Sequence, residues 1–211
     1  MLFSPHRWLR ISILNLLIVS VIGVILRYKI LYSLPFFDQK HLLHGHSHFA
    51  FAGWITQALM ALLVTYLCRQ NATIVFKKYE RLLIINLITA YGMLISFPIE
   101  GYGFFSILFS TLSIFVSYTF AIIDWKDLNR LPEKSISHYW FKAALIFNAI
   151  SSAGAFSLAI MMVTKTIHQN WYLAAIYFFL HFQYNGWFFF SCMGLLNEKI
   201  QPLVSENSKL K

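Results

Sequence analysis

The stretch ISILNLLIVSVIGVIL, residues 11–26, contains no charged side chain and decides the class of fold. Several further apolar runs follow, and they reach roughly 17 to 24 residues, the length an α-helix needs to cross a hydrocarbon core of about 30 Å. The first run is long for the core of a secretory signal peptide, and no small-residue cleavage pattern follows it. We therefore expect a retained first membrane helix.

The composition of the 211-residue chain is typical of a protein that crosses a membrane several times. Hydrophobic residues make up 58% of the sequence and charged residues only 12%, too few to cover a soluble domain of this size. The mean hydropathy is +0.62. We predict an all-α polytopic fold in one transmembrane domain, residues 1–211, without an internal repeat. The six predicted spans are residues 11–33, 45–67, 82–98, 103–123, 141–163 and 171–193.

The Lys and Arg residues predict the orientation of these spans. Of the 17 in the sequence, only Arg27, Lys29, Lys40 and Lys165 fall on the side opposite the N-terminus. Because basic loops stay in the cytoplasm, both termini are expected there, and the net charge of +9 requires no nucleic-acid partner. The chain is thus expected in the cell (inner) membrane, with residues 41–48 on the outer, periplasmic side.

The second predicted span opens with HLLHGHSHFAFAGW, residues 41–54, which places four histidines within eight positions. His44 and His48 are four residues apart and share one face of a helix, a spacing that suits one metal ion. His46 points to the opposite flank, and His41 suits a helix start. Taken singly, His41 and His44 would also fit an interfacial position without any ligand. We treat His44 and His48 as candidate metal ligands.

The sixth predicted span contains a second histidine motif, HFQYNGW, residues 181–187. His181 follows Trp171 by about ten residues, which is about 15 Å along a helix, so it is expected near the membrane midplane. An ionisable residue at that depth is a functional-site candidate. Tyr184 and Asn185 are best placed to bond its second ring nitrogen. One alternative is a buried histidine bonded to a neighbouring helix; the two motifs together favour a metal or heme ligand.

The two motifs resemble a known family. The run HSHFAFAGW, residues 46–54, is similar to the second helix of the heme–copper oxidase superfamily, above all its nitric oxide reductase branch. Residues 181–187 resemble that branch's sixth-helix pattern of His, three residues, Glu-Gly and Trp. The resemblance implies that His46 binds a low-spin heme of the b type and that His181 binds a non-heme metal, copper or iron. Asn185 stands where the reductases have a metal-binding glutamate, and asparagine supplies no carboxylate.

The resemblance covers the N-terminal half of that twelve-helix fold. The family's later helices carry its remaining heme and metal ligands and have no counterpart in six spans. A half-length relative, a piece of a longer protein and a subunit completed by another chain are all open alternatives. A homodimer or a second membrane subunit would supply the missing ligands. The family pattern has no place for His44 and His48, so a second metal or a proton-sensitive gate are their alternative roles.

We expect a lipid-embedded protein that binds heme or metal and acts in electron transfer or in binding NO or O2. An oxidoreductase of the heme–copper oxidase type would be incomplete as a single chain, and the sequence identifies no catalytic residue. The main alternative is a multi-pass transporter or channel component with an outer-side histidine site for a metal ion or a proton. The scarcity of carboxylates in the spans speaks against it. An assembly subunit without a ligand is a third alternative.

Overall fold

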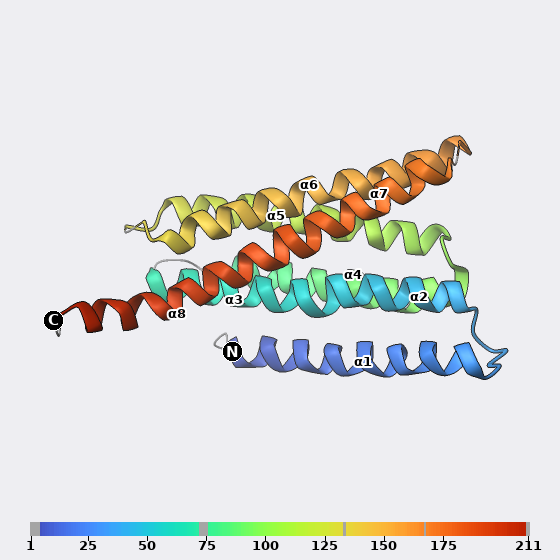
Figure 1. Cartoon of the computed structure of the whole chain (residues 1–211), viewed down its shortest axis with the longest axis horizontal. Coiled ribbons are helices and arrows are strands. Elements are labelled where there is room, and N and C mark those ends of the chain that lie inside the picture. The colour runs from blue at the N-terminus through green and yellow to red at the C-terminus, as the bar shows by residue number, and fades with distance from the viewer. Residues whose placement is uncertain (1–4, 72–75, 133, 167, 210–211) are drawn as a thin grey trace. The chain divides into compact units, whose positions relative to one another are not determined.

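The computed structural model describes residues 5–71, 76–132, 134–166 and 168–209, which form long helices with short connections (Figure 1). This described part of the chain contains no strand, and the prediction of an all-α fold is confirmed. The helices in chain order are α1 (Pro5–Leu31), α2 (Gln39–His48), η1 (Phe49–Thr56), α3 (Gln57–Gln70), α4 (Phe76–Glu100), α5 (Phe104–Asn129), α6 (Ile136–Thr164), α7 (Gln169–His181), η2 (Phe182–Phe188) and α8 (Phe189–Lys209).

Five helical segments among the described residues are long and apolar enough to cross a membrane, which agrees with the predicted multi-pass character. The sixth predicted span, residues 171–193, lies within the continuous run α7–η2–α8. The middle of that run contains His181, Gln183 and Asn185, so it is less apolar than the others. The five segments are Pro5–Leu31, Gln39–Gln70, Lys77–Glu100, Phe104–Asn129 and Ile136–Thr164.

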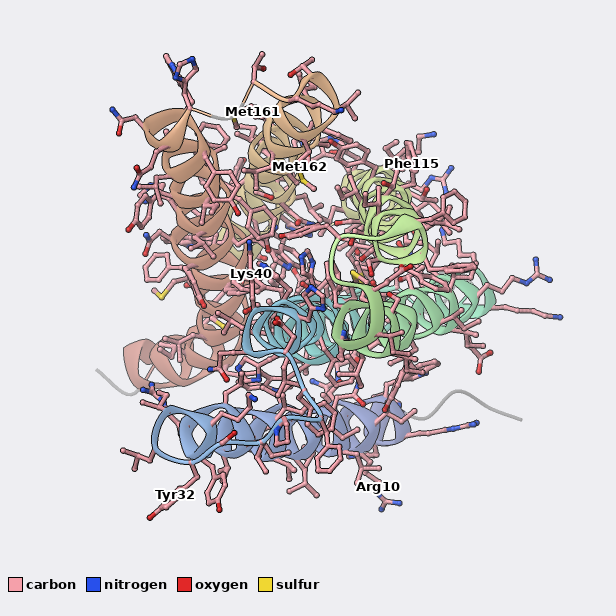
Figure 2. The ribbon with its side chains drawn as sticks, turned by 90° about the vertical axis from the view of Figure 1, so that its right-hand side faces the viewer. Arg10, Tyr32, Lys40, Phe115, Met161 and Met162 are labelled. Carbon is pink, nitrogen blue, oxygen red and sulfur yellow. The ribbon has the colours of Figure 1, made fainter. Side chains whose placement is uncertain are left out.

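The chain divides into two compact units, Met1–Phe120 and Ala121–Lys211. In the first unit, α1 packs against α2, η1 and α3, and α4 packs against the same three helices from its own side. Figure 1 shows α1 (blue) running beside α2 and α3. Figure 2 shows Arg10 of α1, and Tyr32 directly after α1, projecting from the side away from these helices. In the second unit, α6 packs along α7, η2 and α8.

The second span changes from α-helix to π-helix directly after His48. A π-helix closes i→i+5 hydrogen bonds, and such wide turns are rare and frequently mark functional positions. The fully buried Phe49 begins this segment and packs with Val19 of α1 and Ala90 of α4. Gly53 makes room for its ring, since a Cβ at Gly53 would lie 2.6 Å from two ring carbons of Phe49. The wide turn therefore depends on an aromatic ring lying over a glycine.

Buried amide side chains hold the carbonyl groups of this wide turn. Asn15 donates through Nδ2 to the carbonyl of Gly53, and Asn86 donates through Nδ2 to the carbonyl of Ala52 at 3.0 Å. The Tyr91 hydroxyl donates to Asn15 Oδ1 at 2.7 Å. A buried polar group left without a partner costs about 1–3 kcal/mol. These bonds therefore attach η1 to α1 on one side and to α4 on the other.

Candidate functional site

His44 and His48 both face α4, in agreement with their four-residue spacing. The His48 ring stacks on the fully buried Phe97, with centroids 4.4 Å apart and an interplanar angle of 13°. The His44 ring lies 6.1 Å from Phe97 and 4.7 Å from Tyr102, measured between centroids. Its Nδ1 is 3.5 Å from the Tyr102 hydroxyl, at the limit of a hydrogen bond. The two imidazoles thus share an aromatic wall formed by α4 and the turn after it.

His46 lies on the other side of the second span, against α1. The backbone carbonyl of Val19 lies beside its ring. A Cβ at Gly23, one turn further along α1, would lie 3.3 Å from His46 Cε1, so this glycine leaves space beside the ring. His46 therefore does not share a site with His44 and His48. The sequence predicted that His46 points to the flank opposite these two residues, and in the structure that flank faces α1.

Two imidazole nitrogens of this cluster are buried without a hydrogen-bond partner in the described part of the chain. They are Nε2 of His44 and Nδ1 of His46. Native proteins pair nearly all buried polar atoms, so each exception needs a physical explanation such as an ion or a bound group. Among the described residues, no three His, Cys, Asp or Glu side chains are grouped to hold a metal. An ion here would therefore have at most two His, Cys, Asp or Glu ligands from this part of the chain.

His41 belongs to the entrance of the second span rather than to its buried part. Asp38 is the N-cap of α2, and its carboxylate accepts a hydrogen bond from the His41 backbone N–H at 2.8 Å. This bond holds the pKa of the exposed Asp38 carboxyl below its ordinary value. The His41 ring lies against Gly101, whose φ of +63° is in the left-handed region that glycine adopts without strain. The expectation that His41 suits a helix start agrees with this position.

His181 lies in the second unit, on an exposed face at the end of α7. Asn185 Nδ2 is 3.2 Å from His181 Nδ1, so Asn185 is the predicted partner that the structure brings to the ring. Tyr184, the other predicted partner, is 54% exposed. The neighbouring Gln183 points inward instead and donates to Asn148 Oδ1 at 3.1 Å.

The two histidine motifs are copies of one element, and the expectation of no internal repeat is wrong. His48-Phe49 and His181-Phe182 each open a π-helical segment that contains Gly-Trp five and six residues after the histidine. A buried asparagine precedes each histidine by 33 residues, and each bonds its own π-helical segment. In matching order, the identical residues are Asn15, His48, Phe49, Gly53, Trp54, Met60, Leu62 and Leu63 in the first unit, and Asn148, His181, Phe182, Gly186, Trp187, Met193, Leu195 and Leu196 in the second.

The signal for this duplication was present in the sequence as HFAFAGW and HFQYNGW. The repeated pattern also includes Asn15 and Asn148, which were not predicted as site residues because the prediction considered only the histidine motifs. Searches of protein-family models, of curated proteins and of solved structures found no match for the chain. The resemblance to heme–copper oxidases therefore depends on the two motifs alone.

Proposed function

We propose that this chain is a multi-pass membrane protein that binds heme or another redox-active metal centre and acts in electron transfer or in binding NO or O2. The observation that carries the proposal is the pair of buried nitrogens without partners, His44 Nε2 and His46 Nδ1. Each such atom costs about 1–3 kcal/mol in an apolar interior. The lone pair of a neutral imidazole is also the commonest metal donor in proteins. A bound group would remove this cost.

The surroundings of His46 fit a heme ligand. A metal-bound histidine usually donates its second N–H to a carbonyl, which fixes the tautomer and the ring orientation. The Val19 carbonyl lies beside the His46 ring, where it could accept such a bond, and Nδ1 has no hydrogen-bond partner among the described residues. Phe49 and Trp54 pack beside Val19 and would keep water away. Heme iron would supply a one-electron couple there.

His44 and His48 of the first unit are the proposed ligands for a smaller ion, copper or non-heme iron, and His181 is proposed separately as a metal ligand of the second unit. His44 and His48 present two imidazoles on one face beside Phe97, and the Nε2 of His44 has no other partner in the described residues. Metal binding through Nε2 of His181 would require the proton on Nδ1, donated to the amide oxygen of Asn185, whose amide group lies 3.2 Å from Nδ1. Two ligands from one span suit an ion that completes its shell with water or with a second chain.

We propose six spans in the cell (inner) membrane, with both termini in the cytoplasm and the histidine cluster on the outer side. The test uses a variant without Cys68 and Cys192 that carries a single new cysteine. Lys40→Cys should react with a membrane-impermeant maleimide added outside cells, and Asn129→Cys should react only after the membrane is opened. Labelling of Asn129→Cys in intact cells would contradict the topology.

Absorption spectra of the detergent-purified protein, oxidised and dithionite-reduced, test the bound group. Soret and α bands that disappear in His46→Ala and persist in His44→Ala would support the heme site. Absence of these bands with stoichiometric copper or iron, lost in His44→Ala and His48→Ala, would support the small-ion site instead. Absence of both heme and metal would refute the proposal and favour the transport or assembly alternatives.

A further inference from the structure

The turn between α4 and α5 brings the chain back over the second span. Gly101 has a φ of +63°, and its N–H donates to the Phe97 carbonyl at 2.9 Å, which ends α4 with a left-handed glycine. Glu100 accepts through Oε1 from the Ser106 backbone N–H at 2.7 Å and so pairs one of the first N–H groups of α5. The turn is therefore fixed at both ends, and Tyr102 inside it has a defined position.

Tyr102 packs against the two aromatic rings that surround His44. Its ring centroid lies 4.7 Å from that of His44 at an interplanar angle of 61°, and 5.3 Å from that of Phe97 at 88°. Edge-to-face pairs of this kind are a preferred arrangement of aromatic rings. Phe97 in turn stacks on His48 at 4.4 Å. Packing therefore holds the phenol beside His44, where its hydroxyl oxygen lies 3.5 Å from Nδ1.

The two ring nitrogens of His44 have different surroundings. Nδ1 has the Tyr102 hydroxyl as a neighbour, whereas Nε2 is buried without a hydrogen-bond partner in the described part of the chain. A neutral imidazole has one N–H and one lone pair. A proton on Nε2 would leave a buried N–H without an acceptor, which is rare in native proteins. A proton on Nδ1 is accepted by the Tyr102 oxygen, and only a lone pair remains at Nε2.

We infer that Tyr102 is a positioning residue that fixes His44 as the Nδ1–H tautomer and keeps its Nε2 lone pair available to a ligand. Metal-bound histidines usually donate their second N–H to an oxygen, which fixes the tautomer and makes the ligating nitrogen more basic. The phenol oxygen has this position relative to His44. The inference rests on the small-ion site proposed above, for which the lone pair would be the donor. It assigns a role to the α4–α5 turn, in which the sequence predicted no site residue.

The ¹⁵N chemical shifts of the His44 ring test the tautomer directly, because protonated and unprotonated ring nitrogens have well-separated shifts. The metal-free protein, labelled with ¹⁵N-histidine, is measured in lipid nanodiscs at about pH 8, where an imidazole of ordinary pKa is neutral. The signals that His44→Gln removes belong to His44. They should show a protonated Nδ1, and Tyr102→Phe, which removes only the hydroxyl, should bring the Nε2–H tautomer into the spectrum. A proton on Nε2 in the native protein would overturn the inference.

Titration with Cu²⁺ alone, followed by electron paramagnetic resonance, tests the effect on metal binding. Tyr102→Phe should raise the dissociation constant of the ion bound by His44 about tenfold, as expected when a ligand histidine loses its outer partner. Tyr32→Phe is the matched control, since Tyr32 is 57% exposed and its ring stacks on Tyr28 at 4.7 Å. It should leave the dissociation constant unchanged. An unchanged affinity in Tyr102→Phe, or an equal loss in Tyr32→Phe, would overturn the inference.

The two measurements separate the role of Tyr102 from the proposed function. A protonated Nδ1 in a protein that binds neither copper nor iron would leave the tautomer assignment standing and remove the small-ion site. Cu²⁺ bound by His44 with the same affinity in the native protein and in Tyr102→Phe would do the reverse.

Discussion

Replacing Asn15 by leucine tests whether buried amides hold the π-helical turn after His48. Asn15 is fully buried in α1, donates to the Gly53 carbonyl and accepts from the Tyr91 hydroxyl. Leucine has a similar branched shape without hydrogen-bonding atoms, so the change removes two hydrogen bonds, and its larger volume adds a packing cost. Two unsatisfied groups in an apolar interior would cost about 2–6 kcal/mol at about 1–3 kcal/mol each. Side-chain bonds measured in membranes average about 0.6 kcal/mol, and we therefore expect a loss of about 2 kcal/mol.

The assay is equilibrium unfolding in mixed micelles, followed by helical circular dichroism and by tryptophan fluorescence. Tyr91→Phe removes only one of the two bonds and should cost about 1 kcal/mol. The double variant with Asn15→Leu should cost less than the sum of the two single losses, because both changes break the same bond. Ser20→Ala is the control, since Ser20 is exposed and bonds only the Leu16 carbonyl of its own helix. A loss in Asn15→Leu no larger than in this control would refute the reasoning.

Two further changes test the packing of the wide turn and the cap of the second span. Gly53→Ala should destabilise the protein by about 1–3 kcal/mol in the same unfolding assay, because its Cβ would lie 2.6 Å from the Phe49 ring; no loss would mean that the ring moves freely. Asp38 has a lowered pKa, so its cap is fully present above the ordinary value of 3.8 and is lost as the pH falls below it. Below that pH, hydrogen exchange of the His41 backbone amide in the native protein should therefore become faster than the pH dependence of intrinsic exchange alone predicts. Asp38→Asn should show no such step, and a step that persists would assign it to another group.

The long apolar helices were predictable because apolar runs of sufficient length have one stable form in lipid, the helix. Their ends were not, because these helices continue past the apolar run into polar sequence. The span predicted at residues 103–123 belongs to α5, which extends to Asn129. The sixth span stays a prediction because His181, Gln183 and Asn185 make its centre polar.

The sequence predicted which histidines share a helix face, but it did not predict which residues contact them. A four-residue spacing places His44 and His48 together in any helix. That Phe97 stacks on His48, and that His46 lies beside the Val19 carbonyl, depends on how α1 and α4 pack, which local sequence does not encode. The π-helical turns could not be predicted from the spacing of apolar residues either. A wide turn rotates the helix faces of all residues that follow it.

The duplication raises the question of which histidine in the second span is the ligand, since the resemblance to heme–copper oxidases and the repeat point to different residues. The resemblance assigns His46 as the heme ligand and His181 as a metal ligand, yet the repeat makes His181 the counterpart of His48. If the duplicated element keeps one chemical role in both copies, His48 and His181 are the matched ligands and His46 only orients the helix against Val19. If His46 binds heme, the copies have diverged, and the stacking of His48 on Phe97 is structural. The spectra and metal contents of His46→Ala and His48→Ala separate these outcomes, because only the ligand's loss removes the bound group.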